Sequence, residues 1–204
     1  MFIVFEGLDG SGKSTQAKRL YEHFVSEGMK CLLSFAPTDS KLGSLARAVT
    51  KGEFSLKKEA LALLFAADMY EHFTTKISPV LDDGGIVVCD RYYYSNIVYQ
   101  GICEKSIHRI MDYNQQIMKH PPDIVFFLDT TPQVCLERLR ATRKDISIYE
   151  NLNQLETHYK RYQSLFDQTT DNIITIETSG KNEAVISALI LHAYNATTTP
   201  PLLA

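Results

Sequence analysis

The stretch Gly7-Leu8-Asp9-Gly10-Ser11-Gly12-Lys13-Ser14 decides the fold of this 204-residue chain. It fits the pattern G-x-x-x-x-G-K-[ST], and it lies directly after the apolar run Phe2–Glu6 and before a segment with helical spacing. In such a loop the backbone N–H groups turn inward around phosphate oxygens, and the N-terminus of the following helix adds partial positive charge. The sequence therefore predicts a site for a nucleoside triphosphate.

Two side chains of this phosphate-binding loop (P-loop) have distinct expected tasks. We expect Lys13 to reach the β- and γ-phosphates of ATP and Ser14 to offer its hydroxyl to Mg²⁺. The residues expected to bind ATP are Gly7, Gly10, Ser11, Gly12, Lys13, Ser14 and Thr15. Because the motif reports phosphates and not a reaction, a GTPase, an ATP-driven motor and a small-molecule kinase all stay open at this point.

Four more apolar runs, at residues 30–35, 85–90, 123–129 and 172–177, alternate with segments of helical period. The helical segments cover about residues 13–27, 56–81, 106–119, 132–140, 151–167 and 182–195. This alternation is typical of βα units around a parallel sheet. We predict a three-layer α/β fold of the P-loop type, with a five-stranded parallel sheet between helices. It forms one domain over residues 1–196, with a flexible tail over 197–204.

Composition restricts the partners of the chain. Lys and Arg number 21 against 24 Asp and Glu, a net charge of −3, so no basic excess is present to hold a nucleic-acid polymer or an anionic membrane. No run approaches the roughly 18 apolar residues of a membrane span, and no basic, apolar leader opens the chain, so we expect the cytoplasm. The four cysteines and six histidines lack C-x-x-C and H-x-x-x-H spacings, which favours reduced thiols over a zinc site.

The tripeptide Asp90-Arg91-Tyr92 points to a second anion site. It ends the third apolar run, and ligands of open parallel sheets collect beyond the carboxyl ends of the strands, so it is expected to face the P-loop. A carboxylate that ends an apolar strand needs a cation or hydrogen-bond donors, and for Asp90 we expect a place near Mg²⁺, with structural capping as the alternative. The chain has no N-K-x-D stretch for guanine, so a kinase is favoured over a GTPase.

With these residues in place, the chain resembles the thymidylate (dTMP) kinases, a family of nucleoside monophosphate kinases. The resemblance spans roughly residues 1–195, and the stretches that carry it are 5–16, 63–68, 90–101, Pro122-Asp123 and Tyr149-Glu150-Asn151. Its specific part is 90–101, because other monophosphate kinases carry different acceptor motifs. It implies the nucleoside monophosphate kinase fold, a homodimer, and ATP- and Mg²⁺-dependent phosphorylation of dTMP to dTDP in deoxynucleotide synthesis.

The resemblance also implies a phosphate grip for the acceptor. Asp9 is expected to hold the sugar 3′-hydroxyl, unless it is an ordinary acid of an exposed loop. Arg91 and Arg47 are expected to bind the monophosphate, because a guanidinium matches phosphate oxygens bidentately. For Arg47 the alternative is an ordinary exposed charge on a helix.

Four further residues are expected around the sugar and base of the acceptor. Phe65 is expected to stack on thymine, whereas helical spacing alone places it in the core. Asn96, Tyr99 and Gln100 are expected to line the sugar and base, with Tyr99 excluding a 2′-hydroxyl. Packing alone is the alternative for each of these three.

A basic segment, Arg138-Leu139-Arg140-Ala141-Thr142-Arg143-Lys144-Asp145, occupies the position of the family's lid, at about 138–150. A closing lid brings positive charge to the transferring phosphoryl group and excludes water. Because the P-loop has no arginine between Gly7 and Gly12, the catalytic cation is expected from this lid, with Arg143 ahead of Arg138. The alternative is a solvated basic helix end.

Two positions depart from the family pattern. Met69 stands where the family usually has an arginine that hydrogen-bonds thymine, and Phe35-Ala36-Pro37 replaces the Arg-Glu-Pro of bacterial members. A pocket without a polar anchor discriminates less between bases. A kinase of another deoxynucleoside monophosphate or of a nucleoside therefore stays open, as does a nucleotide-binding regulator without activity.

Overall fold

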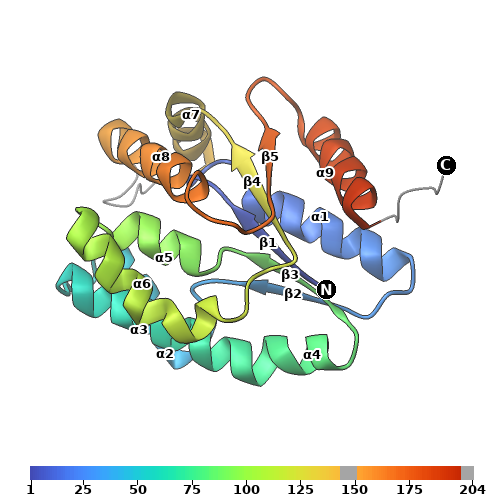
Figure 1. Ribbon diagram of the computed structural model, residues 1–204. Helices are drawn as coiled ribbons and strands as arrows, with labels where there is room; N and C mark the ends of the chain where they lie inside the picture. The colour runs from blue at the N-terminus through green and yellow to red at the C-terminus, as the bar shows by residue number, and fades with distance from the viewer. Residues whose placement is uncertain (143–150, 199–204) are drawn as a thin grey trace.

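Five parallel strands form the centre of the computed structural model, which describes residues 1–142 and 151–198 (Figure 1). The strands are β1 (Phe2–Glu6), β2 (Cys31–Phe35), β3 (Ile86–Asp90), β4 (Ile124–Asp129) and β5 (Ile173–Glu177). They pair in the order β2-β3-β1-β4-β5, and each pair is parallel. All five predicted strands are confirmed, and four begin one residue later than predicted.

Helices cover both faces of the sheet, so the predicted three layers are confirmed. Along β1, Ile3 and Phe5 pack against α1 (Lys13–Ser26) and α9 (Glu183–Thr198). The alternate residues of β1 and its neighbours face the other helices. Because successive side chains of a strand point to opposite faces, a nearly continuous apolar run is what a strand buried on both sides requires.

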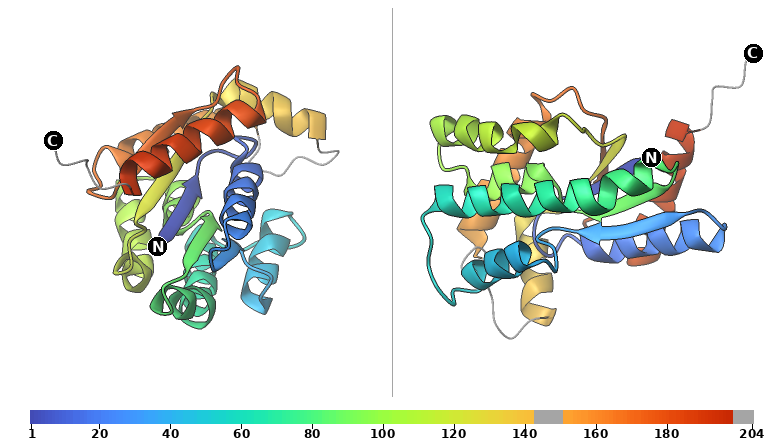
Figure 2. Two further views of the ribbon diagram at one scale, coloured as in Figure 1. Left: turned by 90° about the vertical axis from the view of Figure 1, so that its right-hand side faces the viewer. Right: turned by 90° about the horizontal axis from the view of Figure 1, so that it is seen from below.

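The remaining helices lie on the second face of the sheet or beside it. They are α2 (Lys41–Thr50), α3 (Lys58–His72), the π-helical η1 (Phe73–Ile77), α4 (Ser78–Asp82), α5 (Tyr93–Gln100), α6 (Glu104–Met118), α7 (Pro132–Thr142) and α8 (Leu152–Phe166). The right-hand view of Figure 2 shows α3, η1 and α4 as one long rod. This rod is the predicted helix 56–81, interrupted by a π turn.

Two helices, α2 and α5, lie where the sequence predicts none. Both are short, and α5 consists largely of aromatic and β-branched residues, which have weak helix propensity. Helix α9 runs to Thr198, two residues into the predicted tail. Arg143, Tyr149 and Glu150 and the tail beyond 198 lie outside the described residues.

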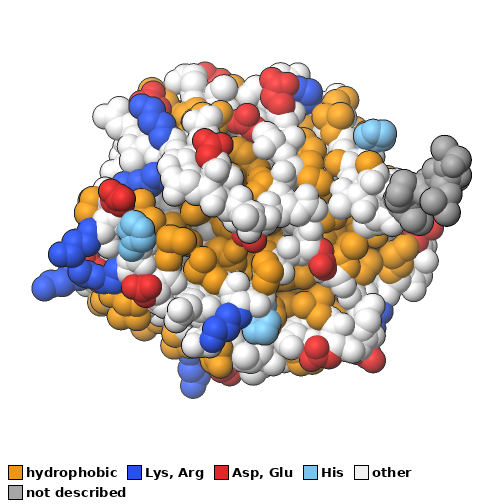
Figure 3. Space-filling view, viewed as in Figure 1, with side chains coloured by type: hydrophobic (Ala, Val, Ile, Leu, Met, Phe, Trp, Pro, Cys, Tyr) orange, Lys and Arg blue, Asp and Glu red, His pale blue; other side chains and the backbone are white. Residues whose placement is uncertain are grey.

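The surface mixes both signs of charge. On the face shown in Figure 3, Lys and Arg side chains are interspersed with Asp and Glu and with hydrophobic side chains. In the described part of the chain, no helix has the length and apolar character needed to span a membrane.

Candidate functional site

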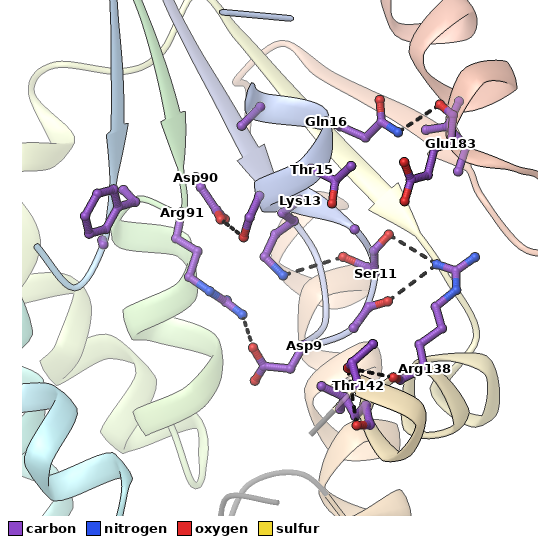
Figure 4. A pocket seen from close by; sticks show the side chains of 18 of the residues that line it. Asp9, Ser11, Lys13, Thr15, Gln16, Asp90, Arg91, Arg138, Thr142 and Glu183 are labelled. Atoms are coloured by element: carbon purple, nitrogen blue, oxygen red, sulfur yellow. Dashed lines mark hydrogen bonds and ion pairs between the residues drawn. The ribbon is translucent and has the colours of Figure 1, made fainter. Parts of the chain in front are cut away.

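A cavity of about 980 Å³ lies beyond the carboxyl ends of the strands. Its walls come from the P-loop, the ends of β2 and β3, the helix α7 and the start of α9. Figure 4 shows side chains from these separate elements pointing into one space. The cavity therefore collects residues from across the chain at the edge where the sequence predicted ligands to bind.

The P-loop wraps one side of this cavity. Six of the seven predicted ATP-binding residues line it, from Gly10 to Thr15, whereas Gly7, the first residue of the loop, does not. Gly10 has a φ of 83°, and a Cβ there would lie 2.6 Å from the carbonyl oxygen of Cys135. Only glycine fits this position, because the loop packs directly on α7.

Lys13 points into the loop from the first turn of α1. Its ammonium group donates to the carbonyl oxygen of Leu8 at 2.7 Å and contacts Ser11 Oγ at 3.5 Å. Burial, with the positive charge of Arg91 as the next cause, lowers the pKa of Lys13 to about 8. A bound polyphosphate would offset this burial, so the site favours an anion.

Ser14 and Asp90 meet between the P-loop and β3. The Ser14 hydroxyl donates to Asp90 Oδ2, while Asp90 Oδ1 is buried with no hydrogen-bond partner among the described residues. A hydroxyl and a carboxylate with spare lone pairs are hard oxygen ligands of the kind that Mg²⁺ takes. The residues therefore fit a magnesium ion. In the described part of the chain, no three His, Cys, Asp or Glu side chains form a metal cluster, so substrate phosphates and water would complete the coordination.

Arg91 crosses the cavity toward the P-loop (Figure 4). Its guanidinium donates to Ser95 Oγ at 2.7 Å and to Asp9 Oδ1 at 2.5 Å, and lies 5.0 Å from the ring centre of Tyr99. The backbone of Arg91 has a φ of 76°, which side chains other than glycine adopt at a cost. This strained conformation directs the guanidinium toward the loop.

Glu6 holds this strained turn, a role that the sequence did not predict. Its fully buried carboxylate accepts from the Tyr92 N–H at 2.8 Å, the Ser95 hydroxyl at 2.7 Å and the Tyr162 hydroxyl at 2.7 Å. Burial raises the pKa of Glu6, against the opposing charge of Arg91. The signal was an acid ending an apolar strand, the same signal that singled out Asp90.

Arg47 lines the same cavity from α2. Its guanidinium donates to the Pro37 carbonyl oxygen at 2.6 Å and to Asp39 Oδ1 at 2.9 Å. The structure thus brings Arg47, Arg91 and Asp9 to one cavity, although they come from three segments far apart in the sequence.

The residues predicted for the sugar and base divide into two groups. Tyr99 contacts the site, because its hydroxyl accepts from the Asp9 N–H at 3.2 Å. Asn96, Gln100 and Phe65 do not line the 980 Å³ cavity. Asn96 Nδ2 donates to the Ala62 carbonyl oxygen, and the side-chain oxygens of Asn96 and Gln100 are buried with no hydrogen-bond partner among the described residues.

Phe65 and Met69 lie one turn apart on α3 in different surroundings. Phe65 is half-buried beside a small cluster that contains Ala46 and Val49, so the expectation of a core phenylalanine from helical spacing holds only in part. Met69 is 3% exposed and belongs to the main core. The position that departs from the family pattern is therefore filled by an apolar, packed side chain.

Arg138 approaches the P-loop from α7. Its guanidinium donates to the carbonyl oxygens of Gly10, Ser11 and Thr178, each at 3.4 Å. Arg138 thus lies at the cavity mouth in contact with the loop, whereas Arg143, the favoured lid cation, falls outside the described residues.

Residues 181–183, at the start of α9, form a wall of the cavity that the sequence did not predict. Lys181, Asn182 and Glu183 line the cavity on the side of Arg138. Glu183 is tied to α1, because its carboxylate pairs with Arg19 at 3.0 Å and its carbonyl oxygen accepts from Gln16 Nε2 at 3.1 Å. No local motif marks these residues, since only the packing of α9 on α1 brings them to the P-loop.

Comparison with known proteins assigns a family to this geometry. The family model described as thymidylate kinase matches residues 5–189. A probable thymidylate kinase of Thermococcus kodakarensis is 41% identical over 164 residues, which cover 76% of this chain and 78% of that protein. A thymidylate kinase of Leptospira interrogans is 35% identical, with 85% of each chain covered. A probable thymidylate kinase of Methanococcus maripaludis is 37% identical, with 94% of each covered.

Proposed function

The chain belongs to the thymidylate kinase family, and from that membership we propose which of its residues transfer the γ-phosphate of ATP to dTMP. The protein is a phosphotransferase that uses ATP to convert dTMP to dTDP. One observation carries the residue assignment. Lys13, at the start of α1, and Arg91, in the turn after β3, both reach into a single cavity, so the two phosphates that they bind can approach one another there.

On the donor side, the P-loop binds the polyphosphate of ATP. Backbone N–H groups from Gly10 to Thr15 and the ammonium group of Lys13 hold the phosphate oxygens. We propose that the nucleoside of ATP lies between Arg138 and the 181–183 segment, which continue the cavity beyond the loop. The loop thus fixes the γ-phosphate at the end that faces Arg91.

On the acceptor side, the monophosphate of dTMP binds Arg91 and Arg47. Arg91 already holds a carboxylate, that of Asp9, and a phosphate offers the same paired oxygens with more charge. When the phosphate takes this place, Asp9 is released to accept the 3′-hydroxyl of the sugar. The acceptor phosphate is anionic near neutral pH, so no side chain has to remove a proton from it.

The developing charge of the transferred group requires cations. We propose that the lid segment supplies one such cation from Arg143, with Arg138 next. Arg138 lines the cavity, and Arg143 lies outside the described residues. Ser14 and Asp90 would hold Mg²⁺, which neutralises phosphate charge when bound. Lys13 and Arg91 keep the two phosphates in line.

For the nucleoside of dTMP we propose the space bordered by α3 and α5. Phe65 offers a half-buried ring for the base. The side-chain oxygens of Asn96 and Gln100, which accept no hydrogen bond from the described residues, offer acceptors for its N–H group. Tyr99 lies beside Asp9, where its ring can pack under the sugar and exclude a 2′-hydroxyl.

A homodimer and a cytoplasmic location complete the proposal. Leu63 and Tyr70, each 49% exposed, lie seven residues apart on one face of α3 and offer an apolar surface to a second copy. All four cysteines are unpaired, as in proteins of reducing compartments. Light scattering of the wild type and of Leu63→Glu tests the dimer.

A coupled assay tests the assignment of substrate and site together. Wild-type protein is expected to phosphorylate dTMP in preference to dUMP, dCMP, dGMP and thymidine. Lys13→Ala is expected to lose about 10²- to 10³-fold in kcat, as removal of a charge-stabilising donor does elsewhere. Lys18→Ala, on the exposed side of the same helix, is the matched control. ATP binding without transfer to any of these acceptors would instead support the nucleotide-binding regulator.

A further inference from the structure

Asp68 is a buried carboxylate outside the phosphate sites. It is 1% exposed, and none of the ion pairs between described residues includes it. Instead it accepts three hydrogen bonds, from the Thr38 N–H at 2.8 Å, the Thr38 hydroxyl at 2.6 Å and the Ser40 hydroxyl at 2.7 Å. A buried charge is tolerated only with such donors, so Asp68 and the segment 38–40 hold one another in place.

This segment begins helix α2. The Ser40 hydroxyl that donates to Asp68 also accepts from the Gly43 N–H at 3.0 Å and thereby caps the helix. Gly43 lies so close to Thr38 that a Cβ would come within 2.1 Å of the Thr38 carbonyl oxygen. Thr38 and the first turn of α2 therefore move as one unit.

Both the backbone and the guanidinium of Arg47 are held by the unit formed by Thr38 and the first turn of α2. Its backbone lies in α2, seven residues after the cap. Its guanidinium turns back and donates to the carbonyl oxygen of Pro37, the residue before Thr38, at 2.6 Å. A shift of Thr38 would thus move both the root of the Arg47 side chain and the acceptor that orients its guanidinium.

Helix α3 contacts the connecting segment at a second point. His72, one turn after Asp68, lies 2.5 Å from Ser34 Oγ through its Nε2. Ser34 is one of the cavity-lining residues 33–37, and Asp68 binds Thr38 and Ser40, which follow them. One face of α3 therefore fixes the wall of the cavity from both sides.

We infer that Asp68 is a positioning residue for the acceptor phosphate, acting through Thr38 and Ser40 on Arg47. The inference rests on the proposed role of Arg47 as a phosphate ligand. If Asp68 only stabilised the packing of α2 on α3, its loss would lower stability and change the KM values for dTMP and ATP alike. A positioning residue affects the KM for dTMP and leaves the KM for ATP unchanged, because the P-loop lies on other elements.

The first test is steady-state kinetics of Asp68→Ala and Asp68→Asn. Asp68→Ala is expected to raise the KM for dTMP about tenfold, the effect of losing one charge-assisted hydrogen bond, with the KM for ATP unchanged. Asp68→Asn is expected to restore part of this loss. Its amide oxygen can still accept from the Thr38 N–H, and its amino group can donate to the hydroxyls. Equal changes in both KM values would overturn the inference.

A double-mutant cycle with Arg47→Ala separates this inference from the proposed function. If Asp68 acts through Arg47, Asp68→Ala adds little to the dTMP KM of Arg47→Ala. The same tenfold rise in both backgrounds would overturn the route through Arg47 while leaving Arg47 as a ligand. An unchanged dTMP KM in Arg47→Ala alone would reject the proposed role of Arg47, and with it the inference.

Two milder variants keep the test decisive if Asp68→Ala does not fold. Thr38→Val and Ser40→Ala each remove one donor to Asp68. Each is expected to raise the KM for dTMP and to leave the KM for ATP unchanged. Asp123→Asn is the matched control, because its carboxylate accepts from the Phe2 N–H at 2.6 Å at the opposite end of the sheet. It is expected to leave both KM values unchanged, and a dTMP effect equal to that of the Asp68 variants would contradict positioning.

Discussion

The guanidinium of Arg91 donates a hydrogen bond over 2.5 Å to the carboxylate of Asp9, a residue 82 positions earlier in the chain. Asp9 belongs to the P-loop and Arg91 to the turn after β3, so this ion pair joins the two phosphate sites. The carboxylate occupies the place that we propose for the acceptor phosphate. Binding of dTMP is therefore an exchange of one anion for another at Arg91.

The proposed bidentate binding of the acceptor phosphate by the Arg91 guanidinium can be tested by substitution with lysine. Arg91→Lys keeps the positive charge but cannot bind two oxygens in one plane. We expect kcat/KM for dTMP to fall about 10- to 100-fold, the range for one or two charged hydrogen bonds. The KM for ATP stays unchanged. Arg109→Lys, at an exposed pair with Glu59, is the control, and an unaltered dTMP KM in Arg91→Lys would contradict the assignment.

Asp90 Oδ1, which accepts no hydrogen bond within residues 1–142 and 151–198, predicts that the Asp90 carboxylate supports Mg²⁺ binding. We expect Asp90→Asn to raise the Mg²⁺ concentration for half-maximal activity about tenfold or more, as loss of a supporting carboxylate does at metal sites. Saturating Mg²⁺ should recover most of the activity. Asp129→Asn is the control, because Asp129 also ends a strand but accepts from the Tyr159 hydroxyl at 2.8 Å. Identical Mg²⁺ titrations of Asp90→Asn and wild type would count against the site.

His158 predicts a loss of stability in acid. Burial, with Arg161 as the next cause, lowers the pKa of His158 to about 4, while an unfolded histidine titrates near 6.5. Between these values the unfolded chain binds more protons, so the free energy of unfolding decreases as the pH falls from about 6.5 to about 4. The full effect is up to about 3 kcal/mol.

Denaturant unfolding at several pH values measures this contribution. In His158→Gln, the free energy of unfolding is expected to change less between pH 4 and pH 6.5 than in the wild type. His192→Gln, on the exposed side of α9, is expected to retain it. If the free energy of unfolding of His158→Gln falls with pH as steeply as that of the wild type, other groups cause the acid sensitivity.

Glu6→Gln tests the support beneath Arg91. The amide can accept on one atom only, so at least one of the donors from Tyr92, Ser95 and Tyr162 is left facing an N–H group. We expect a loss of about 1–3 kcal/mol of stability, with a raised KM for dTMP because the turn at Arg91 loosens. Thermal unfolding and dTMP kinetics check both parts. A fully stable variant with wild-type dTMP kinetics would refute the support role.

The packed side chain of Met69 adds no polar contact to the base, and discrimination between dTMP and dUMP is expected to be modest. Thymine and uracil present the same hydrogen-bonding groups, so the two nucleotides differ mainly by the burial of one methyl group. We expect the ratio of kcat/KM for dTMP over dUMP to lie at about 10- to 200-fold. A ratio of 10⁴ or more would exceed what the burial of one methyl group supplies and would contradict this account of the base site.

The sequence by itself determined the sheet and the phosphate loop. Both depend on local patterns, because an apolar run of five or six residues specifies a buried strand and the spacing of Gly7, Gly12 and Lys13 specifies the loop between strand and helix. The resemblance then supplied Arg91, Arg47 and Asp9, and the structure places all three at one cavity.

Tertiary structure alone decided the roles of buried acids and the partners of each arginine. Glu6 and Asp68 carry no local signal beyond an acid in an apolar segment, and their donors come from Tyr92 and Thr38, far away in the chain. Whether such a carboxylate is exposed, forms an ion pair or accepts several hydrogen bonds depends on which elements pack over it. That packing is a property of the assembled layers, and no stretch of sequence contains it.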